Sequence, residues 1–576
     1  RTNLYSVFSE LTSRLLTTNG RNGIIIPTGI ATDDTNKDFF ANLVENNSLV
    51  SLFDFENRKK LFPEVDSRQK FCLLSTSGGE LEKGYEAQFA FFLHDVLDLM
   101  DKRRVFTLSR EDFLNINPNT KTCPVFRTKQ DAELTKKIYS YVPVLINEDK
   151  NQNPWEVSFK QGLFNMSSDS HLFKEEGTLI NEGFKLYGNR YLNDEGEIYL
   201  PLYESKMIWH YDHRFGSYEG VDSRSSTHIK HPTEKEYQNP EYLIKPWYWV
   251  DSKEVDKVIE SKWFLGFRDI ARTTDERTGI FSCFPYSGIS NKLPIILKKG
   301  AINNLLFYTF LTSINFDFFI RQKIGSTSLN FYLVKQFPTI TYIPTKLLFI
   351  QYASELVYTS WDIKALIDNI WKEADKNLRL KILEQWLGNK KATGGFEWQI
   401  PDWHEAYPEI HWDSPLKDQE MGASISEELK KQLIEYNEGC PLPPFKWDKE
   451  RRENLRVELD AYYALLYGLE RDELRYILDP KEVHGEDFPS ESFRVLKEKE
   501  IRKHGEYRTR RLILEAYDRL RPDWDMKAHK KKLKEVWEKY QEDLSEEKEE
   551  PKQKKKTSTN KAEEPKEDYG QGKLEF

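Results

Sequence analysis

The sequence predicts an α/β protein that begins with the second half of a doubly wound sheet, continues into an irregular α+β region and ends in a mainly helical region. Three patterns predict this order. Apolar residues recur at helical spacing from Asn3 to Leu16, a β-branched apolar run covers Ile24 to Ile26, and dense helical patterns follow Pro344. A chain of 576 residues is long for a single core, so we expect three or more domains.

The first part should alternate helix and strand. Asn3 is a plausible N-cap for the first helix, and Asn19-Gly20 should end it. The run Ile24 to Ile26, between Gly23 and Pro27, suits a parallel strand buried on both faces. We expect the next elements in the order helix, strand, strand, at Thr35 to Glu45, Leu49 to Phe55 and Lys70 to Thr76.

In doubly wound sheets, ligands bind beyond the carboxyl ends of the strands. Pro27, Thr28 and the loop that contains Phe62 follow predicted strands, and they are therefore placed to line a site.

The remaining domains are predicted from changes in composition. We expect a first domain over residues 1–85, a connector at 86–104 with a short helix between Gly84 and Met100, an irregular α+β domain at 105–345, a helical domain at 346–541 and a disordered charged tail at 542–576. Short strands are expected at Val105 to Leu108, Ile198 to Leu200 and Lys292 to Leu297. The segment Asn303 to Ile320 is apolar on nearly every face, which is typical of a buried helix.

Bulk properties restrict the function classes. No apolar run approaches the ~18 residues of a membrane span, and four widely spaced cysteines favour neither a disulfide framework nor a cysteine-based zinc site, so we expect a cytoplasmic protein. The chain starts at Arg1 directly before the first helix, and we expect it to be a piece of a longer protein.

The net charge of −9 does not by itself indicate a nucleic-acid partner. Between Lys262 and Gln336, however, ten basic residues stand against four acidic ones, an excess of +6. This segment has the composition of a phosphate-binding surface, with an ordinary solvated surface as the alternative.

Several short motifs in the first part occur in a characteristic order. They are Asn3-Leu4-Tyr5 with Phe8 one helical turn later, a Gly-Gly-like turn, the strand ending Ile26-Pro27-Thr28, and Leu61-Phe62-Pro63. Together they resemble the post-catalytic half of gamma-class adenine-specific DNA methyltransferases, in the large single-chain form of restriction-modification and phage-defence systems. The likeness is close over the first 75 residues and looser to residue 345, where the family has its target-recognition domain.

The resemblance implies a class I methyltransferase sheet, S-adenosylmethionine as the methyl donor and double-stranded DNA as the partner. Extruding an adenine from the duplex costs a few kcal/mol, which stacking helps to repay. Phe62 would stack on that base, whereas Asn3, Tyr5, Phe8 and Pro27 would line the cofactor side. Ordinary core packing is the alternative for Phe62 and Phe8, and an N-cap and a core aromatic would explain Asn3 and Tyr5.

The DNA contacts are expected in two segments. Arg268, Arg272 and Arg277 could lie on one side of a turn, where guanidinium groups suit phosphates and guanine edges; salt bridges to nearby carboxylates are the alternative. Lys323, Ser326 and Thr327 flank a loop that in the family approaches DNA.

Two hallmarks of the family are not found in this sequence: a glycine-rich cofactor turn, and an Asn/Asp/Ser-Pro-Pro-Tyr/Phe loop before Asn3. Leu442-Pro443-Pro444-Phe445 lacks the polar first residue and is interpreted as a linker. We therefore expect this chain alone not to methylate DNA. The alternative functions are a non-catalytic subunit that reads DNA sequence and, through the helical domain, an added scaffolding role.

Metal chemistry is not expected. The pairs His210/His213 and His228/His231 invite a zinc hypothesis, but structural sites made only of histidine are rare, and His213 is better explained as a hydrogen-bonding residue. Carboxylates near Glu498 and Asp523 lack the strand context of a nuclease, so no nuclease is assigned.

Overall fold

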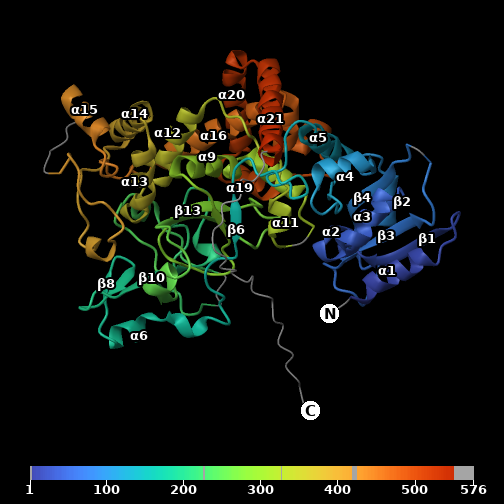
Figure 1. Cartoon of the computed structure of the whole chain (residues 1–576), viewed down its shortest axis with the longest axis horizontal. Coiled ribbons are helices and arrows are strands. Elements are labelled where there is room, and N and C mark those ends of the chain that lie inside the picture. Colours follow the sequence, from blue (N-terminus) through green and yellow to red (C-terminus); the bar gives the residue numbers. More distant parts are fainter. Residues whose placement is uncertain (1–2, 83, 225–227, 326, 418–424, 550–576) are drawn as a thin grey trace, which may run out of the picture.

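The computed structural model describes residues 3–82, 84–224, 228–325, 327–417 and 425–549. A small N-terminal unit lies at one end of the molecule, and a larger body contains the remaining sheets and helices (Figure 1). None of the described helices is long and apolar enough to cross a membrane.

The N-terminal unit is built on one five-stranded sheet. Its elements are α1 (Leu4–Arg14), β1 (Arg21–Pro27), α2 (Gly29–Thr32), α3 (Lys37–Glu45), β2 (Leu49–Glu56), β3 (Lys70–Ser77), β4 (Ala87–Leu93) and β5 (Phe106–Leu108). The strand order is β1-β3-β2-β4-β5. β3 runs antiparallel to β1 and β2, and β4 runs parallel to β2. The predicted succession of helix, strand, helix, strand and strand is confirmed.

The first strand does not have the position that its composition predicts. Among the described strands, β1 pairs with β3 alone and runs antiparallel to it, so β1 is an edge strand and not a parallel strand buried on both faces. Ile25, in the middle of the apolar run, is 57% exposed. A run of isoleucines indicates a strand with apolar surroundings, but it cannot show whether a second neighbour is present in the same chain.

The helix predicted between Gly84 and Met100 is wrong for its first half. Ala87–Leu93 is the strand β4, and only Val96–Met100 is helical, as a 3-10 turn. A short apolar run fits both the helical period and the strand period. Here β2 supplies the backbone hydrogen-bond partners that make the run a strand. The first core also continues past residue 85 into α4 (Arg110–Ile116) and α5 (Lys129–Tyr139), whose apolar side chains pack against β4 and β5.

Two further sheets lie in the middle of the chain. One contains β7 (Phe173–Lys174), β8 (Lys185–Tyr187), β9 (Arg190–Leu192), β10 (Ile198–Tyr203), β11 (Trp249–Asp251) and β14 (Gly288–Ile289), and the other contains β6 (Ser158–Lys160), β12 (Trp263–Phe267), β13 (Phe281–Pro285) and β15 (Ile295–Leu297). The strands predicted near 105, 198 and 295 are confirmed. Short helices α6 (Glu176–Asn181), α7 (Glu234–Tyr237) and α8 (Ser252–Asp256) connect them.

The predicted buried aromatic helix is present as two helices, α9 (Ala301–Thr312) and α10 (Ile314–Arg321). Ser313 separates them, because its hydroxyl accepts a hydrogen bond from the Phe316 amide and caps α10. Every residue of α10 is buried. The prediction of a buried, all-round apolar segment is confirmed.

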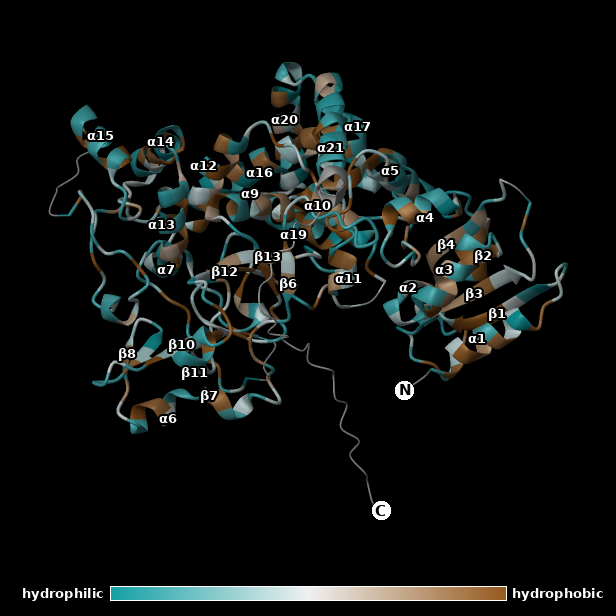
Figure 2. Cartoon of the chain, viewed as in Figure 1, coloured by the Kyte–Doolittle hydropathy of each residue, from teal (hydrophilic) through white to brown (hydrophobic). Residues whose placement is uncertain are grey.

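The C-terminal part is helical, as predicted. After α11 (Phe331–Val334) come α12 (Lys346–Val357), α13 (Lys364–Glu373), α14 (Lys376–Thr393), α15 (Glu427–Glu435), α16 (Lys449–Leu466), α17 (Arg471–Leu478), α18 (Pro480–His484), α19 (Arg494–His504), α20 (Arg508–Leu520) and α21 (Met526–Glu549). One continuous apolar core joins these helices to the β12–β13 sheet. In Figure 2, β3 and β4 are mostly brown, whereas long stretches of α20 and α21 are teal.

The expected start of the charged tail needs correction, because α21 continues to Glu549 and residues 542–549 are helical. Residues 550–576 lie outside the described part of the chain.

Candidate functional site at the end of the first sheet

A cavity of about 330 Å³ opens at the carboxyl end of β1. Pro27 and Thr28 form its floor, Tyr5 and Lys70 line its walls, and Gly325 reaches it from the larger body. The sequence predicted a site at this end of the sheet from Pro27, Thr28 and the Phe62 loop, and the resemblance added Tyr5; Phe62 itself does not line the cavity. The contribution of Gly325 depends on the way that the two units pack together.

A buried carboxylate lies beside this cavity. Asp54, in the middle of β2, is 1% exposed, and its Oδ1 accepts a hydrogen bond from the Thr28 hydroxyl at 2.5 Å. Its Oδ2 accepts one from the Phe92 amide at 3.0 Å. Burial raises the pKa of Asp54, and the nearby Lys70 ammonium opposes this rise. Sequence reasoning missed Asp54; its place between Phe53 and Phe55 was the available signal that it is buried, but not of its role.

Tyr5 belongs to a second polar group that fixes α1 against the turn after β1. Its hydroxyl accepts a hydrogen bond from Asn36 Nδ2 at 3.1 Å, and the same amide donates to the Gly29 carbonyl at 3.0 Å. Ser6 donates to Asn36 Oδ1 at 2.6 Å. A Cβ atom on Gly29 would lie 2.3 Å from Asp33 Oδ2, so a larger residue here would displace the Asp33 carboxylate. The cavity wall formed by Tyr5 is therefore held in place by buried hydrogen bonds.

Phe62 stands half exposed on a loop at the same end of the sheet. The buried Asn57 side chain holds this loop: its Nδ2 donates to the Phe62 carbonyl at 2.8 Å and to the Val65 carbonyl at 2.9 Å, and its Oδ1 accepts from the Phe62 amide at 2.9 Å. The ring of Phe62 meets Phe71 edge-on, with centroids 4.9 Å apart. Phe71 in turn pairs with Pro27 across the β1–β3 ladder. An aromatic ring that is 39% exposed is thus presented from a well-anchored loop.

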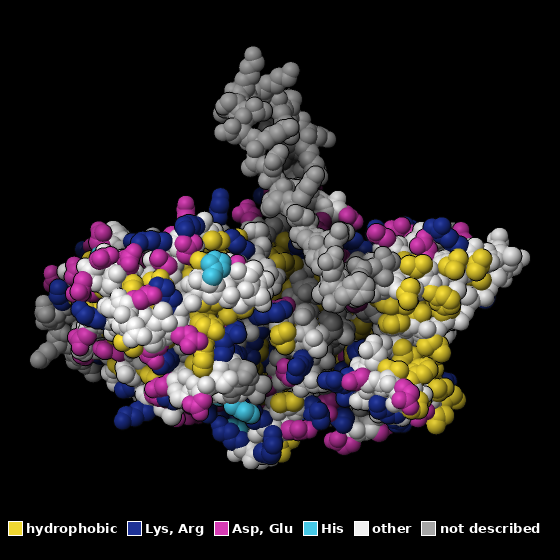
Figure 3. Space-filling model, turned by 90° about the horizontal axis from the view of Figure 1, so that it is seen from below, with side chains coloured by type: hydrophobic (Ala, Val, Ile, Leu, Met, Phe, Trp, Pro, Cys, Tyr) yellow, Lys and Arg dark blue, Asp and Glu magenta, His cyan; other side chains and the backbone are white. Residues whose placement is uncertain are grey.

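Phe8 and its neighbours form an exposed apolar face on α1. The face consists of Leu4, Val7, Phe8, Leu11 and Leu15, and Phe8 is 52% exposed. Figure 3 shows a broad hydrophobic area over this end of the molecule. Asn3 occupies the N-cap position as predicted, but its side chain makes no capping hydrogen bond. The helix is amphipathic as predicted, and no described residue covers its apolar side.

The three predicted DNA-contacting arginines do not share one surface. Arg268 donates to the Ile208 carbonyl and lies over the Trp209 ring, and Arg277 donates to the carbonyls of Thr312 and Ser313. Only Arg272 extends into solvent. The basic excess of this segment is therefore largely used to satisfy internal carbonyl groups.

The loop after α10 lies beside the Arg272 turn. The Ala271 amide donates to the Thr327 carbonyl at 3.0 Å, and the Leu329 amide donates to the Asp269 carbonyl at 2.8 Å. Gly325 packs near Thr32 at the rim of the sheet-end cavity. Thr327 is exposed, and Ser326 lies outside the described residues. The structure thus brings Thr327, Arg272 and the cavity together.

Lys323 differs from the other residues predicted on this loop. Its ammonium group is buried and donates to the carbonyls of Ile116 and Gln336 and to Asn117 Oδ1. Burial holds the pKa of Lys323 well below its usual range. Lys323 joins the N-terminal unit to the larger body and does not reach the surface.

Two side chains of α10, Arg321 and Asp317, hold the turn that carries Arg272. Arg321 donates to the carbonyls of Thr273, Asp275 and Glu276, and its guanidinium also reaches the Ser492 carbonyl on the helical side. Asp317 accepts two amide hydrogen bonds from the end of the same turn, each at 2.8 Å. These hydrogen bonds hold the backbone that follows Arg272, whose side chain is exposed.

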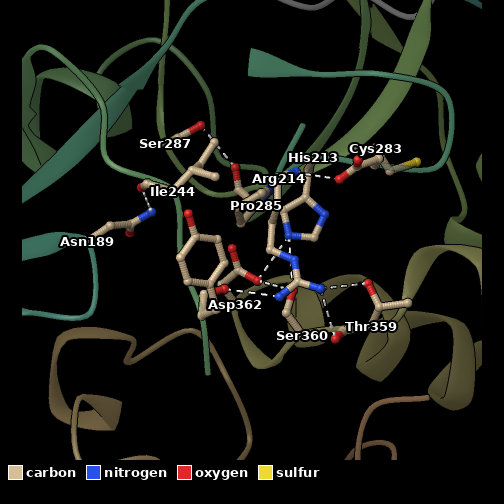
Figure 4. A network of polar contacts seen from close by, with 12 residues as sticks. Asn189, His213, Arg214, Ile244, Cys283, Pro285, Ser287, Thr359, Ser360 and Asp362 are labelled. Carbon is tan, nitrogen blue, oxygen red and sulfur yellow. Dashed lines mark hydrogen bonds and ion pairs between the residues drawn. The ribbon is translucent and has the colours of Figure 1, made fainter. Parts of the chain in front are cut away.

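His213 has the hydrogen-bonding role that the sequence predicted. Its Nε2 lies 3.0 Å from Asp362 Oδ1 and 3.1 Å from the Ser360 hydroxyl (Figure 4). Arg214, beside it, donates to the carbonyls of Asn239, Tyr242 and Thr359. This network fastens the middle sheets to the helical region. Among the described residues, no group of three or more acidic, histidine or cysteine side chains is arranged to hold a metal ion.

No protein-family model matches this chain, and no curated protein matches it. Among solved structures, the type IIG restriction endonuclease BpuSI is similar over 66% of this chain and 48% of its own, with 14% identity and a TM-score of 0.23. The type IIL restriction-modification enzyme MmeI, solved in complex with DNA, is similar over 67% of this chain and 48% of its own, with 9% identity and a TM-score of 0.34. The chain spans about half the length of each. At these values neither likeness establishes a shared fold or function.

Proposed function

We propose that this chain is the base-clamping and DNA-reading part of an adenine-specific DNA methyltransferase of a restriction or defence system. The whole protein would transfer a methyl group from S-adenosylmethionine to the exocyclic amino group of a flipped adenine. The observation that carries the proposal is Phe62: a 39% exposed ring on a loop anchored by Asn57, at the carboxyl end of the sheet, packed on Phe71, whose chain neighbour Lys70 lines the polar cavity.

Phe62 suits a base-stacking role because its position is fixed before any ligand arrives. Stacking a base on an aromatic ring contributes about 1–3 kcal/mol, which is comparable with the cost of extruding a base. Its edge-on contact with Phe71 holds the ring in place. Thr28 and Lys70 would offer hydrogen-bonding groups to the polar edge of the base from the cavity.

The residues proposed to contact the cofactor are Phe8, Tyr5 and Pro27. Phe8 offers an apolar ring for the adenine of S-adenosylmethionine, and Tyr5 and Pro27 lie on the cavity side of the same helix-strand pair. Tyr5 and Pro27 fit one wall of such a site, whereas Phe8 does not line the cavity and would meet the cofactor on the exposed face of α1. The methyl donor would supply the transferred group, and the second wall would come from a segment that pairs with the free edge of β1 and covers the apolar face of α1.

Arg272 and Thr327 are the proposed contacts to the DNA backbone. Both are exposed, their segments are joined by hydrogen bonds, and Gly325 connects them to the rim of the cavity. A duplex that lay across them would bring a flipped base toward Phe62. Arg268, Arg277 and Lys323 would act indirectly, by supporting the backbone of this surface.

The proposal is tested with duplexes in which one 2-aminopurine lies opposite an abasic site, compared with fully paired duplexes of the same sequence. The chain should prefer the displaced base, and Phe62→Ala should reduce that preference by about 5- to 150-fold, since about 1–3 kcal/mol of stacking is lost. Leu61→Ala, an exposed apolar neighbour on the same loop, is the matched control. 2-Aminopurine fluorescence reports stacking, and fluorescence anisotropy gives the affinity.

Arg272→Ala should behave differently. It should weaken binding to all duplexes alike and reduce the slope of log affinity against log salt by about 1. If Phe62→Ala and Leu61→Ala gave the same affinities for both duplexes, the base-clamping role would be wrong. Retained DNA binding in that case would favour the alternative, a non-catalytic subunit that reads DNA.

A further inference from the structure

A second cavity, of about 270 Å³, lies between the middle sheets and the C-terminal helices. Trp209 and His210 line one side, the junction of α9 and α10 forms the base, and α16 and α19 form the other side. It shares no lining residue with the cavity at the end of the first sheet. The proposed function makes no use of it.

The acidic side chains that line this cavity already have ion-pair or hydrogen-bond partners. Glu276 pairs with Lys499 at 2.8 Å and Glu453 with Arg508 at 2.7 Å. Glu500 accepts from the Thr509 amide at 2.7 Å, and Asp460 accepts from the Ile314 amide at 2.7 Å. Glu276 and Glu453 are thus each paired with a cation, whereas Glu500 and Asp460 accept hydrogen bonds from backbone amides.

Three basic side chains in the lining differ from them. Among the described residues, Lys449, Lys503 and Arg456 have no carboxylate oxygen within 4.0 Å. Lys449 and Lys503 come from different helices, and their ammonium groups lie close together, since Lys503 is the leading cause that lowers the pKa of Lys449. Lys449 is also the first residue of α16, where the helix dipole favours an anion. These three cations therefore make no close ion pair with a described carboxylate, although Glu453 and Glu234 act on Lys449, and Asp460 on Arg456, from farther away.

His210, a buried histidine, also lines the cavity. The side chain is 4% exposed, and neither ring nitrogen makes a hydrogen bond of normal geometry, although the Gly279 backbone lies near. Burial, followed by Arg277 and Arg456, holds the pKa of His210 well below its usual range, so the ring is neutral. A neutral imidazole has one donor and one acceptor nitrogen, and a buried polar group normally has a partner.

We propose that this cavity binds a small phosphate-bearing molecule, with the phosphate between Lys449, Lys503 and Arg456 and the organic part in contact with His210. The volume of about 270 Å³ lies just below the ~300–1,000 Å³ that is usual for small-ligand sites, which suits a small molecule such as a mononucleotide or a sugar phosphate and excludes a polymer from the interior. A bound phosphate would also pair the two ammonium groups that now repel each other.

The test uses the whole chain with adenosine monophosphate and with inorganic phosphate as probes, measured by isothermal titration calorimetry. Wild type should bind the nucleotide, and inorganic phosphate more weakly. The double variant Lys449→Gln/Lys503→Gln should weaken both at least 10-fold. His210→Phe should weaken the nucleotide more than inorganic phosphate, because only the organic part reaches that ring.

Lys531→Gln is the matched control, since Lys531 is an exposed lysine of α21 away from the cavity, and it should leave both affinities unchanged. Circular dichroism verifies that each variant is folded. Saturable binding by neither probe at about 10 mM, where a millimolar site would be filled, would overturn the proposal. Equal affinities in the control and the double variant would do the same. Displacement of the nucleotide by duplex DNA, with DNA affinity lost in the double variant, would assign these cations to the DNA surface instead.

Discussion

The apolar face of α1 and the aromatic pair α9–α10 are similar in composition and opposite in environment. Leu4, Val7 and Phe8 face solvent, whereas Phe307, Phe310 and Phe316 are completely buried. Burial of apolar side chains follows from the presence of a partner surface, which the larger body supplies from its own sheets and helices. The N-terminal unit has an exposed apolar helix face and an edge strand, neither of which is covered by a described residue. The difference teaches that a helical apolar pattern predicts a contact surface without showing which chain segment completes it.

The largest effect should come from the body. Phe316→Ala removes a ring whose centroid lies 4.6 Å from that of Phe310 and 5.4 Å from that of Phe337, and it should lower the free energy of unfolding by about 3–5 kcal/mol. Urea denaturation followed by tryptophan fluorescence measures this change. A loss below about 1 kcal/mol would mean that this core repacks freely, and the contrast with α1 would disappear.

The next effect concerns Asp460, a buried carboxyl group of the larger body. Burial raises the pKa of Asp460 to about 6. An unfolded aspartate titrates near pH 3.9, so the folded state binds the proton more tightly between these values. The resulting stabilisation is fully present below about pH 4 and is lost as the pH rises through about 6, which amounts to about 3 kcal/mol.

Asp460→Asn keeps the acceptor for the Ile314 amide and should remove this pH dependence. Denaturation of wild type and variant at pH 4, 5, 6 and 7 checks it. Parallel curves for the two proteins would contradict the raised pKa.

A smaller effect is expected in the N-terminal unit. Asn57→Ala leaves the Phe62 amide and the carbonyls of Phe62 and Val65 without their partner, and it should cost about 1–3 kcal/mol. Hydrogen exchange should increase in the loop between β2 and β3 and stay unchanged in β13. Asn46→Ala, at an exposed position that ends α3, is the control. Unchanged exchange in the loop would show that Asn57 does not anchor Phe62.

The smallest effect should come from the exposed face of α1. Phe8→Ser removes a ring that contacts solvent, so the free energy of unfolding should change by less than about 0.5 kcal/mol, whereas any self-association of the chain should weaken. Denaturation and sedimentation velocity measure the two quantities. A loss above about 1.5 kcal/mol would show that Phe8 belongs to a core, and the two regions would no longer differ.

The sequence predicted those features that depend on local pattern. The spacing of Leu4, Val7 and Phe8 placed α1, and the unbroken aromatic run placed α9 and α10 inside. It could not predict features that depend on distant backbone groups. The role of Asp54 requires the Phe92 amide, and the burial of Lys323 requires carbonyls from the N-terminal unit.

The same limit explains the basic segment. A count of arginines and lysines contains no information on which of them point inward, and Arg268 and Arg277 find carbonyl partners only when the sheets and helices assemble. Arg272, which has no such partner, remained the exposed member. The sequence predicted that the loop of Phe62 follows a strand. That Asn57 holds this loop could be recognised only from the three hydrogen bonds of its side chain.

The clamp made by Arg321 has a consequence for protein engineering. One guanidinium holds the carbonyls of Thr273, Asp275 and Glu276 and also reaches Ser492. A turn grafted here from another protein would present its carbonyl groups at different positions, and a buried arginine would be left with unsatisfied donors. Replacement of the Arg272 turn would therefore need to include α10 and the segment around Ser492, so the smallest exchangeable unit is a spatial module assembled from three separate stretches of sequence.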